Sequence, residues 1–255
     1  MKEFFFSDGI QIYYETFGKG KPLILIHGWG SDINHGWVET GWVKPLQSIR
    51  RVIAIDCRGH GRSEKPHDQK VYSYSTMARD VLNLMDHLNI TKADVFGYSM
   101  GAFMAVFLLG HHRERFSSMI LGGIGDETEE SKDARFIAEA LRAEDISHIT
   151  TRLGRAYRDY VDSNLNNDRE ALALSALQMW PEGYPIQLGG DDLVKVDIPV
   201  IIINGENDFP YVASDRKLAN AISGARLVRI PYKNHLNVVE DETFKKEVLE
   251  FLERQ

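Results

Sequence analysis

Residues 97–101 read Gly-Tyr-Ser-Met-Gly, so that Ser99 has a glycine two positions away on each side. An apolar run rich in β-forming residues, 93–96, precedes this segment, and an apolar helical pattern, 102–109, follows it. That context predicts a sharp strand-to-helix turn, which lifts a serine hydroxyl clear of the backbone. The glycines suit it because they face neighbouring backbone, where a side chain would clash. Ser99 is therefore our candidate nucleophile.

An acyl-transfer site also needs donors for the oxyanion that forms on the substrate. The backbone N–H of Met100, at the start of the predicted helix, points toward the place where this charge would develop. The glycines of the segment 27–30 (His-Gly-Trp-Gly) would let that loop curl toward Ser99. We therefore predict Trp29 N–H and Met100 N–H as the donor pair. Loss of one such donor costs on the order of 3 kcal/mol of transition-state stabilisation.

A serine nucleophile needs a base, and the base needs an acid that orients it. His235 is one of nine histidines, but it lies in the loop after the last predicted strand and before the terminal helix. Asp208 follows the very apolar strand 200–203 and is the predicted acid. Asp126, which follows the preceding strand, and Glu206, within the same turn, are its rivals.

Short β-rich runs alternate with helical patterns, as in a mostly parallel sheet covered by helices on both faces. We therefore predict an α/β fold with an eight-stranded sheet whose first two strands form a hairpin. A stripe of apolar residues between Met77 and Leu88 predicts a core-facing helix, and a terminal helix is expected over 242–252. The predicted strands are 3–6, 10–17, 23–26, 52–55, 94–96, 119–121, 200–203 and 227–230.

The alternation of predicted strands and helices is interrupted between Asp126 and about Asp192. This predicts a helical lid (126–190) inserted into a core of residues 1–125 and 191–255. Helical patterns are expected at 134–142 and 172–178, followed by a loop that contains Trp180, Pro181, Gly183, Tyr184 and Pro185. The aromatic side chains of this region are interpreted as lid core more than as substrate contacts. They are Phe136, Tyr157, Tyr160, Trp180 and Tyr184.

Composition narrows the function class. The 255 residues are 43% hydrophobic and 26% charged, as in ordinary globular proteins, and fit one domain with an insertion. The net charge of −7 argues against a nucleic-acid partner. Cys57 is the single cysteine, which excludes an internal disulfide, and no apolar run approaches the roughly 20 residues of a membrane span. We expect a cytoplasmic protein, a monomer or homodimer, acting on a small molecule away from membranes.

No cofactor or metal is expected. The segment 18–21 (Gly-Lys-Gly-Lys) has neither the spacing nor the Ser/Thr of a phosphate-binding loop, and no dinucleotide glycine fingerprint follows a strand. Asp191 and Asp192 form an isolated acidic pair, which is interpreted as a solvated turn. His111 and His112 lie at a helix end with no third ligand nearby in the sequence.

Taken together, these segments resemble the α/β-hydrolase-fold superfamily, in particular a serine esterase-like member with a small helical lid. The resemblance covers nearly the whole chain. Ser99, Asp208 and His235 follow the superfamily's chain order of nucleophile, acid and histidine. The stretch 56–63 (Asp-Cys-Arg-Gly-His-Gly-Arg-Ser) corresponds to a structural loop near the site, so Arg58 and His60 are not counted as catalytic. Asn234 stands where the family usually has glycine, and asparagine tolerates that backbone geometry.

The resemblance implies reaction type better than substrate. Haloalkane dehalogenases and epoxide hydrolases of this fold carry aspartate where this chain has Ser99, which disfavours both. The expected function is a carboxylesterase that cleaves small carboxylic esters through an acyl-serine intermediate. The alternatives are an acyl-homoserine or other lactone hydrolase, a carbon–carbon bond hydrolase, and a ligand-binding protein on a hydrolase fold.

Overall fold

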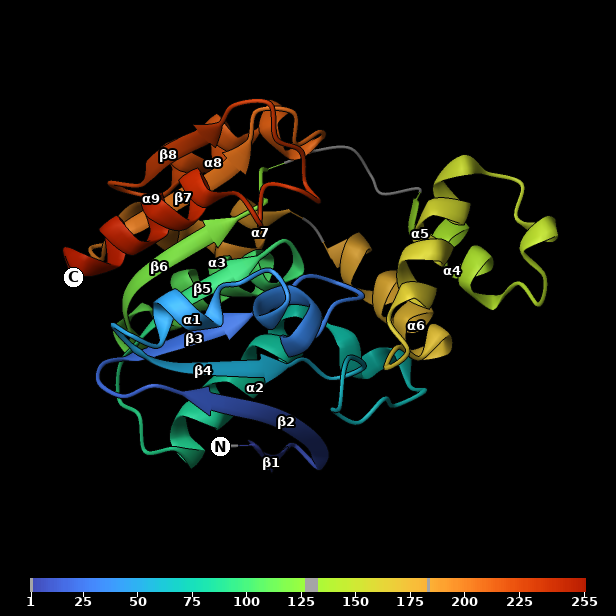
Figure 1. Ribbon diagram of the computed structural model, residues 1–255, viewed down its shortest axis with the longest axis horizontal. Coiled ribbons are helices and arrows are strands. Elements are labelled where there is room, and N and C mark those ends of the chain that lie inside the picture. The colour runs from blue at the N-terminus through green and yellow to red at the C-terminus, as the bar shows by residue number, and fades with distance from the viewer. Residues whose placement is uncertain (1, 127–132, 183) are drawn as a thin grey trace.

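The computed structural model describes residues 2–126, 133–182 and 184–255 (Figure 1). The strands are β1 (Lys2–Ser7), β2 (Ile10–Phe17), β3 (Pro22–Ile26), β4 (Arg51–Asp56), β5 (Ala93–Tyr98), β6 (Phe116–Gly122), β7 (Val200–Gly205) and β8 (Arg226–Ile230). The helices are α1 (Val43–Leu46), α2 (Tyr74–His87), α3 (Met100–His112), α4 (Asp133–Arg142), α5 (Arg152–Ser163), α6 (Arg169–Met179), α7 (Pro185–Gly189), α8 (Asp215–Ala221) and α9 (Glu242–Glu253). Along the described residues, no helix has both the length and the apolar character needed to cross a membrane.

Within the described residues, the strands form one eight-stranded sheet in the order β1-β2-β4-β3-β5-β6-β7-β8. β1 pairs antiparallel with β2, and β2 pairs antiparallel with β4, while every later pairing is parallel. The predicted mostly parallel sheet is therefore confirmed. Because parallel strands end at the same edge, the loops that follow β3, β5, β7 and β8 converge there.

Side chains of the central strands alternate between two apolar layers, as the period of a strand requires. Leu23 and Leu25 of β3 pack on the side that α1 and α9 cover. Ile24 and Ile26 point to the opposite layer, which contains buried residues of α2, α3 and α8. The sheet is thus buried on both faces, which explains why its central strands read as nearly continuous apolar runs.

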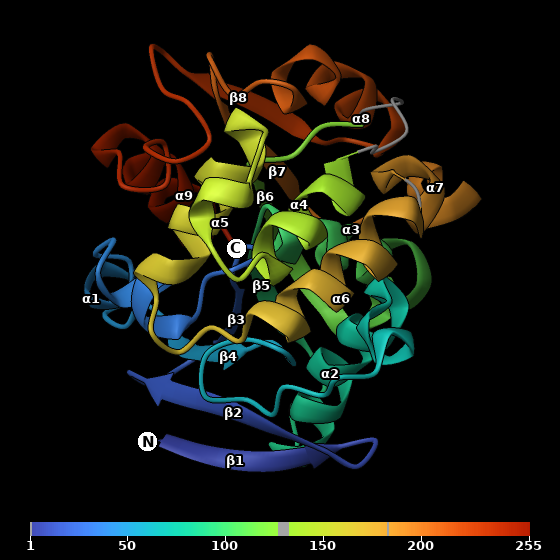
Figure 2. The same cartoon turned by 90° about the vertical axis from the view of Figure 1, so that its right-hand side faces the viewer.

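Helices α4, α5 and α6 lie beyond the carboxyl edge of the sheet, on the right in Figure 1 and nearest the viewer in Figure 2. Helix α4 packs against both α5 and α6, and Arg142 of α4 forms an ion pair with Glu170 of α6 at 2.7 Å. α7 instead packs against α3, where a Cβ on Gly110 would lie 1.8 Å from the Gly189 carbonyl oxygen. The division into a core and a lid of residues 126–190 remains our proposal.

The loop expected from Trp180 to Pro185 is partly helical. A short helical turn spans Trp180–Glu182, and α7 begins at Pro185, while Gly183 lies outside the described residues. Proline at the first helical position supplies the helical φ, and its missing N–H removes no hydrogen bond there. The acidic pair 191–192 likewise lies in a short helical turn, where Asp192 pairs with Lys195 at 2.7 Å.

Candidate active site

Ser99 occupies the turn between β5 and α3 with φ 52° and ψ −117°. A positive φ is strained for a residue with a side chain, and such strain is typical of functional positions. The Ser99 N–H donates to the Gly122 carbonyl oxygen at 2.8 Å, and the Ser99 carbonyl accepts from Ala102 N–H at 2.8 Å. These bonds fix the turn between the sheet and the first turn of α3.

The two flanking glycines are sterically required, as the sequence predicts. A Cβ on Gly97 would lie 2.3 Å from the Gly101 carbonyl oxygen, and a Cβ on Gly101 would lie 2.0 Å from the Ile26 carbonyl oxygen. Both distances are shorter than any real carbon–oxygen contact. The glycines therefore allow α3 to begin directly against the end of β3.

Ser99, His235 and Asp208 come together although 136 and 27 positions separate the histidine from its two partners. The His235 Nε2 atom lies 3.0 Å from Ser99 Oγ, and its Nδ1 atom lies 3.0 and 3.2 Å from the two Asp208 carboxylate oxygens. A carboxylate only accepts, so Nδ1–H donates to Asp208 and Nε2 accepts from the serine hydroxyl. Asp208 is fully buried, whereas the His235 side chain is 27% exposed. This is the geometry of a base held between a nucleophile and an orienting acid.

The rival acids have other partners. Asp126 forms an ion pair with Lys217 at 2.6 Å and accepts the Ile186 N–H at 2.9 Å. Glu206 is exposed and accepts the Tyr232 N–H at 3.3 Å. Of the three carboxylates considered, the structure therefore brings Asp208 to His235.

The loop of residues 28–32, here called the oxyanion loop, lies beside the serine. A Cβ on Gly28 would lie 3.4 Å from Ser99 Cβ. Within the described residues, no protein acceptor takes the backbone N–H of Trp29 or of Met100. Both amides are therefore free to donate to an oxygen bound next to Ser99, as the oxyanion-hole prediction requires.

Two tyrosines that sequence reasoning did not single out hold His235 in place. The Tyr98 hydroxyl donates to the His235 carbonyl oxygen at 2.5 Å, and the Tyr211 ring lies 5.0 Å from the imidazole. Burial, followed by the negative charge of Asp208, raises the pKa of Tyr98 well above its ordinary value, so its hydroxyl remains a donor. Its place directly before Ser99, at the end of a strand, could have identified it.

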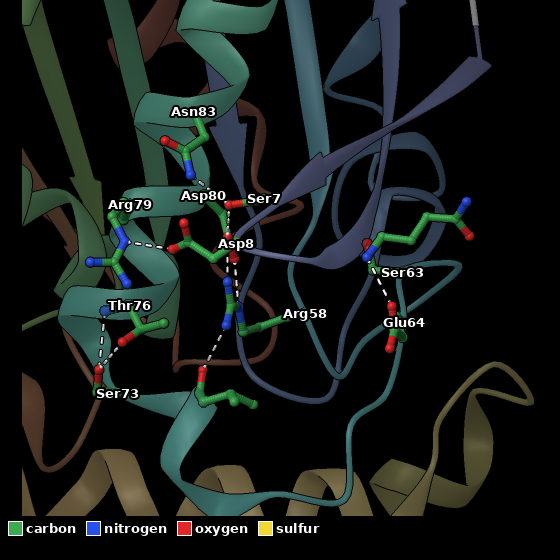
Figure 3. A network of polar contacts seen from close by, with 12 residues as sticks. Ser7, Asp8, Arg58, Ser63, Glu64, Ser73, Thr76, Arg79, Asp80 and Asn83 are labelled. Atoms are coloured by element: carbon green, nitrogen blue, oxygen red, sulfur yellow. Dashed lines mark hydrogen bonds and ion pairs between the residues drawn. The ribbon is translucent and has the colours of Figure 1, made fainter.

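The segment 56–63 is a scaffold. Buried Asp56 accepts the Ile33 and Arg62 N–H groups at 2.7 and 2.8 Å. Figure 3 shows Arg58 against Asp80 of α2, with guanidinium-to-carboxylate distances of 2.8 and 2.6 Å. These contacts agree with the exclusion of Arg58 from the candidate catalytic residues.

His27 also has a structural environment. Its Nε2 accepts the Cys57 N–H at 3.0 Å, so its Nδ1–H donates to the Gly28 carbonyl oxygen at 2.8 Å. The ring therefore braces the start of the oxyanion loop, as predicted. In the part of the chain that the structure describes, no three His, Cys, Asp or Glu side chains are grouped so that they could hold a metal ion.

Comparison with known proteins identifies the fold of this chain. Residues 21–143, which include β3, the oxyanion loop and Ser99, match the family described as alpha/beta hydrolase fold. The chain belongs to the α/β-hydrolase fold superfamily. It superposes on the enol-lactonase from Burkholderia xenovorans LB400 with a TM-score of 0.82 and 25% identity, over 98% of this chain and 100% of the other.

Two further relatives of this hydrolase carry different activities in their names. A non-heme chloroperoxidase of Kitasatospora aureofaciens is 26% identical over 97% of this chain and 98% of its own length. A 2-hydroxymuconate semialdehyde hydrolase of Pseudomonas sp. strain CF600 is 36% identical over 116 residues, which are 45% of this chain and 40% of the relative. The superfamily is therefore clear, while relatives of this chain differ in the reactions for which they are named.

Proposed function

We propose that this α/β hydrolase is a serine carboxylesterase that cleaves small carboxylic esters through an acyl-serine intermediate. The observation that carries the proposal is the hydrogen-bonded series of Ser99, His235 and Asp208. The His235 Nε2 atom lies 3.0 Å from Ser99 Oγ, and its Nδ1 atom lies 3.0 Å from Asp208 Oδ1. A cytoplasmic location, action as a monomer or homodimer, and independence of cofactors are parts of the same proposal.

In the first half of the reaction, His235 Nε2 takes the proton of Ser99 as Oγ attacks the ester carbonyl. The imidazolium that forms is stabilised by Asp208, and the negative carbonyl oxygen accepts from the Trp29 and Met100 N–H groups. The tetrahedral intermediate then collapses. His235 gives its proton to the leaving alcohol, and the acyl group remains on Ser99.

In the second half, water enters the place of the alcohol. His235 takes a proton from this water, whose oxygen attacks the acyl carbon, and the same two amides hold the second oxyanion. Return of the proton to Ser99 Oγ releases the carboxylic acid. Each group thus serves twice, and the enzyme returns to its starting protonation state.

The test is hydrolysis of p-nitrophenyl esters from acetate to dodecanoate, compared between the native protein and Ser99→Ala. We expect rapid release with the short esters and a loss of about five to six orders of magnitude in kcat without Ser99. Circular dichroism of both proteins provides the control for folding. Appreciable turnover by a pure, folded Ser99→Ala protein would refute the proposal.

Lactone hydrolysis is the second candidate, because the superposed Burkholderia enzyme is named an enol-lactonase. The same residues would open a ring ester, and the product alcohol would stay attached to the acyl chain. One acyl-homoserine lactone is therefore included in the panel. If the open esters are not hydrolysed but the lactone is opened in a Ser99-dependent reaction, the assignment would change to a lactonase. If neither is hydrolysed, carbon–carbon bond hydrolysis or a ligand-binding role would be favoured.

A further inference from the structure

The oxyanion loop is held from the side of α5 and α6 as well as from the sheet. The Trp29 indole Nε1–H donates to Ser175 Oγ of α6 at 2.9 Å, in a buried environment. The Trp29 ring also lies 5.6 Å from the rings of Tyr157 and Trp180. The side chain whose backbone N–H is a candidate oxyanion donor is thus anchored in this helical region.

The segment 164–167 between α5 and α6, here called the asparagine loop, contacts the same turn. Asn164 and Asn166 each donate from Nδ2 to Asp32 Oδ2, at 3.0 and 3.2 Å. Asn167 donates from Nδ2 to the Gly30 carbonyl oxygen at 2.8 Å and to the Val161 carbonyl oxygen at 3.0 Å. Three side-chain amides of the asparagine loop therefore donate to the oxyanion loop, and one of them also donates to α5.

These contacts change the pKa of the Asp32 carboxyl group. Burial alone would raise its pKa, but the hydrogen bonds from the His35 N–H, Asn164 and Asn166 outweigh burial, and the pKa of Asp32 lies below its ordinary value. The carboxylate therefore remains a charged acceptor for the asparagine loop. Hydrogen bonds to a charged acceptor are stronger than those between neutral groups.

Asn167 has an uneven set of partners. Both of its contacts use the amide nitrogen, while its buried Oδ1 atom has no hydrogen-bond partner in the described structure. A buried unpaired acceptor is costly. Asn167 acts here as a double donor, and its amide nitrogen links the Gly30 carbonyl to the carboxyl end of α5.

The oxyanion loop is a tight turn, so its residues are coupled to one another. The Ser31 N–H donates to the Gly28 carbonyl oxygen at 3.2 Å, and Gly30 has φ +72°. The Trp29 N–H lies within this turn, and an oxyanion donor works only when it is aimed at the developing charge. A shift of the Gly30 carbonyl would rotate the turn and move that N–H.

We propose that Asn167 and Ser175 are positioning residues that hold the oxyanion loop from the lid, through the Gly30 carbonyl and the Trp29 indole, and so aim the Trp29 N–H at the reacting carbonyl. The inference rests on the proposed function, because it assigns the same Trp29 amide. It adds that the asparagine loop and α6 position the oxyanion donor, in addition to covering the site.

The test compares Asn167→Ala and Ser175→Ala with the native protein on a short p-nitrophenyl ester. Alignment of the oxyanion donor matters most in the transition state, so we expect kcat to fall about 10-fold or more while KM changes little. The second readout is phosphorylation of Ser99 by diethyl p-nitrophenyl phosphate, which needs no knowledge of the natural substrate. Its rate should fall in parallel, because the phosphoryl oxygen would occupy the same site.

Thr151→Ala is the matched control. Thr151 Oγ1 accepts the Gly154 N–H at 3.0 Å and caps α5, so its loss weakens the same region without touching the oxyanion loop. We expect this variant to lower Tm but to retain the native kcat and phosphorylation rate. If Asn167→Ala fails to fold, the nearly isosteric Ser175→Ala decides the question alone.

Four outcomes overturn the inference. Native rates in the folded variants would do so. An increase confined to KM would also do so, because it would indicate that these residues contact the substrate. An equal loss of kcat in Thr151→Ala would reduce the effect to stability of the region. Failure of the native protein to react at Ser99 with either reagent would remove the proposed function as well, and so distinguishes the two failures.

Discussion

Asp208 and Asp126 both follow strands at the same edge of the sheet, yet their surroundings differ. Asp208 is fully buried against His235, while Asp126 is paired with Lys217. Asp208→Asn leaves the shape of the site but removes the charge that stabilises the imidazolium and selects the tautomer of His235. We expect a fall in kcat of about 10⁴-fold, measured by ester hydrolysis near neutral pH.

The matched variant is Asp126→Asn, which replaces a similarly buried carboxylate. It should lose stability through its Lys217 pair and retain a rate close to that of the native enzyme. The reverse pattern, with the large loss in Asp126→Asn, would show that the acid is assigned wrongly.

This choice also shows what the sequence could decide about single residues. The sequence predicts Ser99 and His235 from a motif and from a place in the last loop, and the structure brings the two together at 3.0 Å. It also predicts Asp208 as the acid, but Asp126 stays a rival in the sequence because both follow apolar strands. The difference lies in partners far along the chain, Lys217 for one and His235 for the other, and only three-dimensional packing brings these close.

At the scale of elements, the segment between β4 and α2 supports the site without taking part in it. Arg58 and Asp80 are almost completely buried, and Ser7 of β1 also donates to Asp80, at 2.5 Å (Figure 3). Arg58→Met would leave a buried carboxylate without its cation. Breaking a buried pair in this way costs about 3–5 kcal/mol, which we expect as the loss in the free energy of unfolding in urea titrations.

The double variant Arg58→Met, Asp80→Leu removes both charges and is the control. It should recover much of the lost stability, because two apolar groups replace a pair whose desolvation was costly. In both variants, kcat per folded molecule should equal that of the native enzyme. A selective loss of kcat with unchanged stability would give Arg58 a role in the reaction.

The elements themselves were predicted with uneven success, for physical reasons. Strands such as β3 and β7 were recognisable because burial on both faces demands continuous apolar runs, and α2 because one face alone is buried. The sequence predicts a loop from Trp180 to Pro185, whereas the structure is partly helical there. The contacts of Asn167 and Ser175 could not be predicted, because they depend on how α5 and α6 pack against the core.

At the scale of the whole molecule, enclosure of polar groups makes stability depend on pH. His60 is fully buried, and its Nδ1–H donates to the Arg58 carbonyl oxygen at 2.9 Å, while Nε2 has no partner within the described residues. Burial lowers the pKa of His60 from 6.5 to about 3. The folded protein therefore holds this ring neutral at pH values where an unfolded chain would protonate it.

The direction of the effect follows from proton counts. Between pH 6.5 and about 3, the unfolded chain binds a proton at His60 that the folded protein does not bind. The free energy of unfolding must then decrease as pH falls, by up to about 1.4 kcal/mol per pH unit from this residue. Above pH 6.5 neither state binds the proton, and the contribution is constant.

Burial raises the pKa of Asp56, which has the opposite consequence, because its folded form takes up a proton first and gains stability as pH falls. A single stability curve therefore mixes the two effects, and a difference between variants is needed. His60→Gln keeps an amide donor for the Arg58 carbonyl and removes the titration. We expect the native protein to lose about 3 kcal/mol more than His60→Gln between pH 7 and 4.5, measured by urea unfolding at each pH. Parallel curves for the two proteins across this range would contradict the assignment, and would mean that His60 is protonated as readily in the folded molecule as in the unfolded chain.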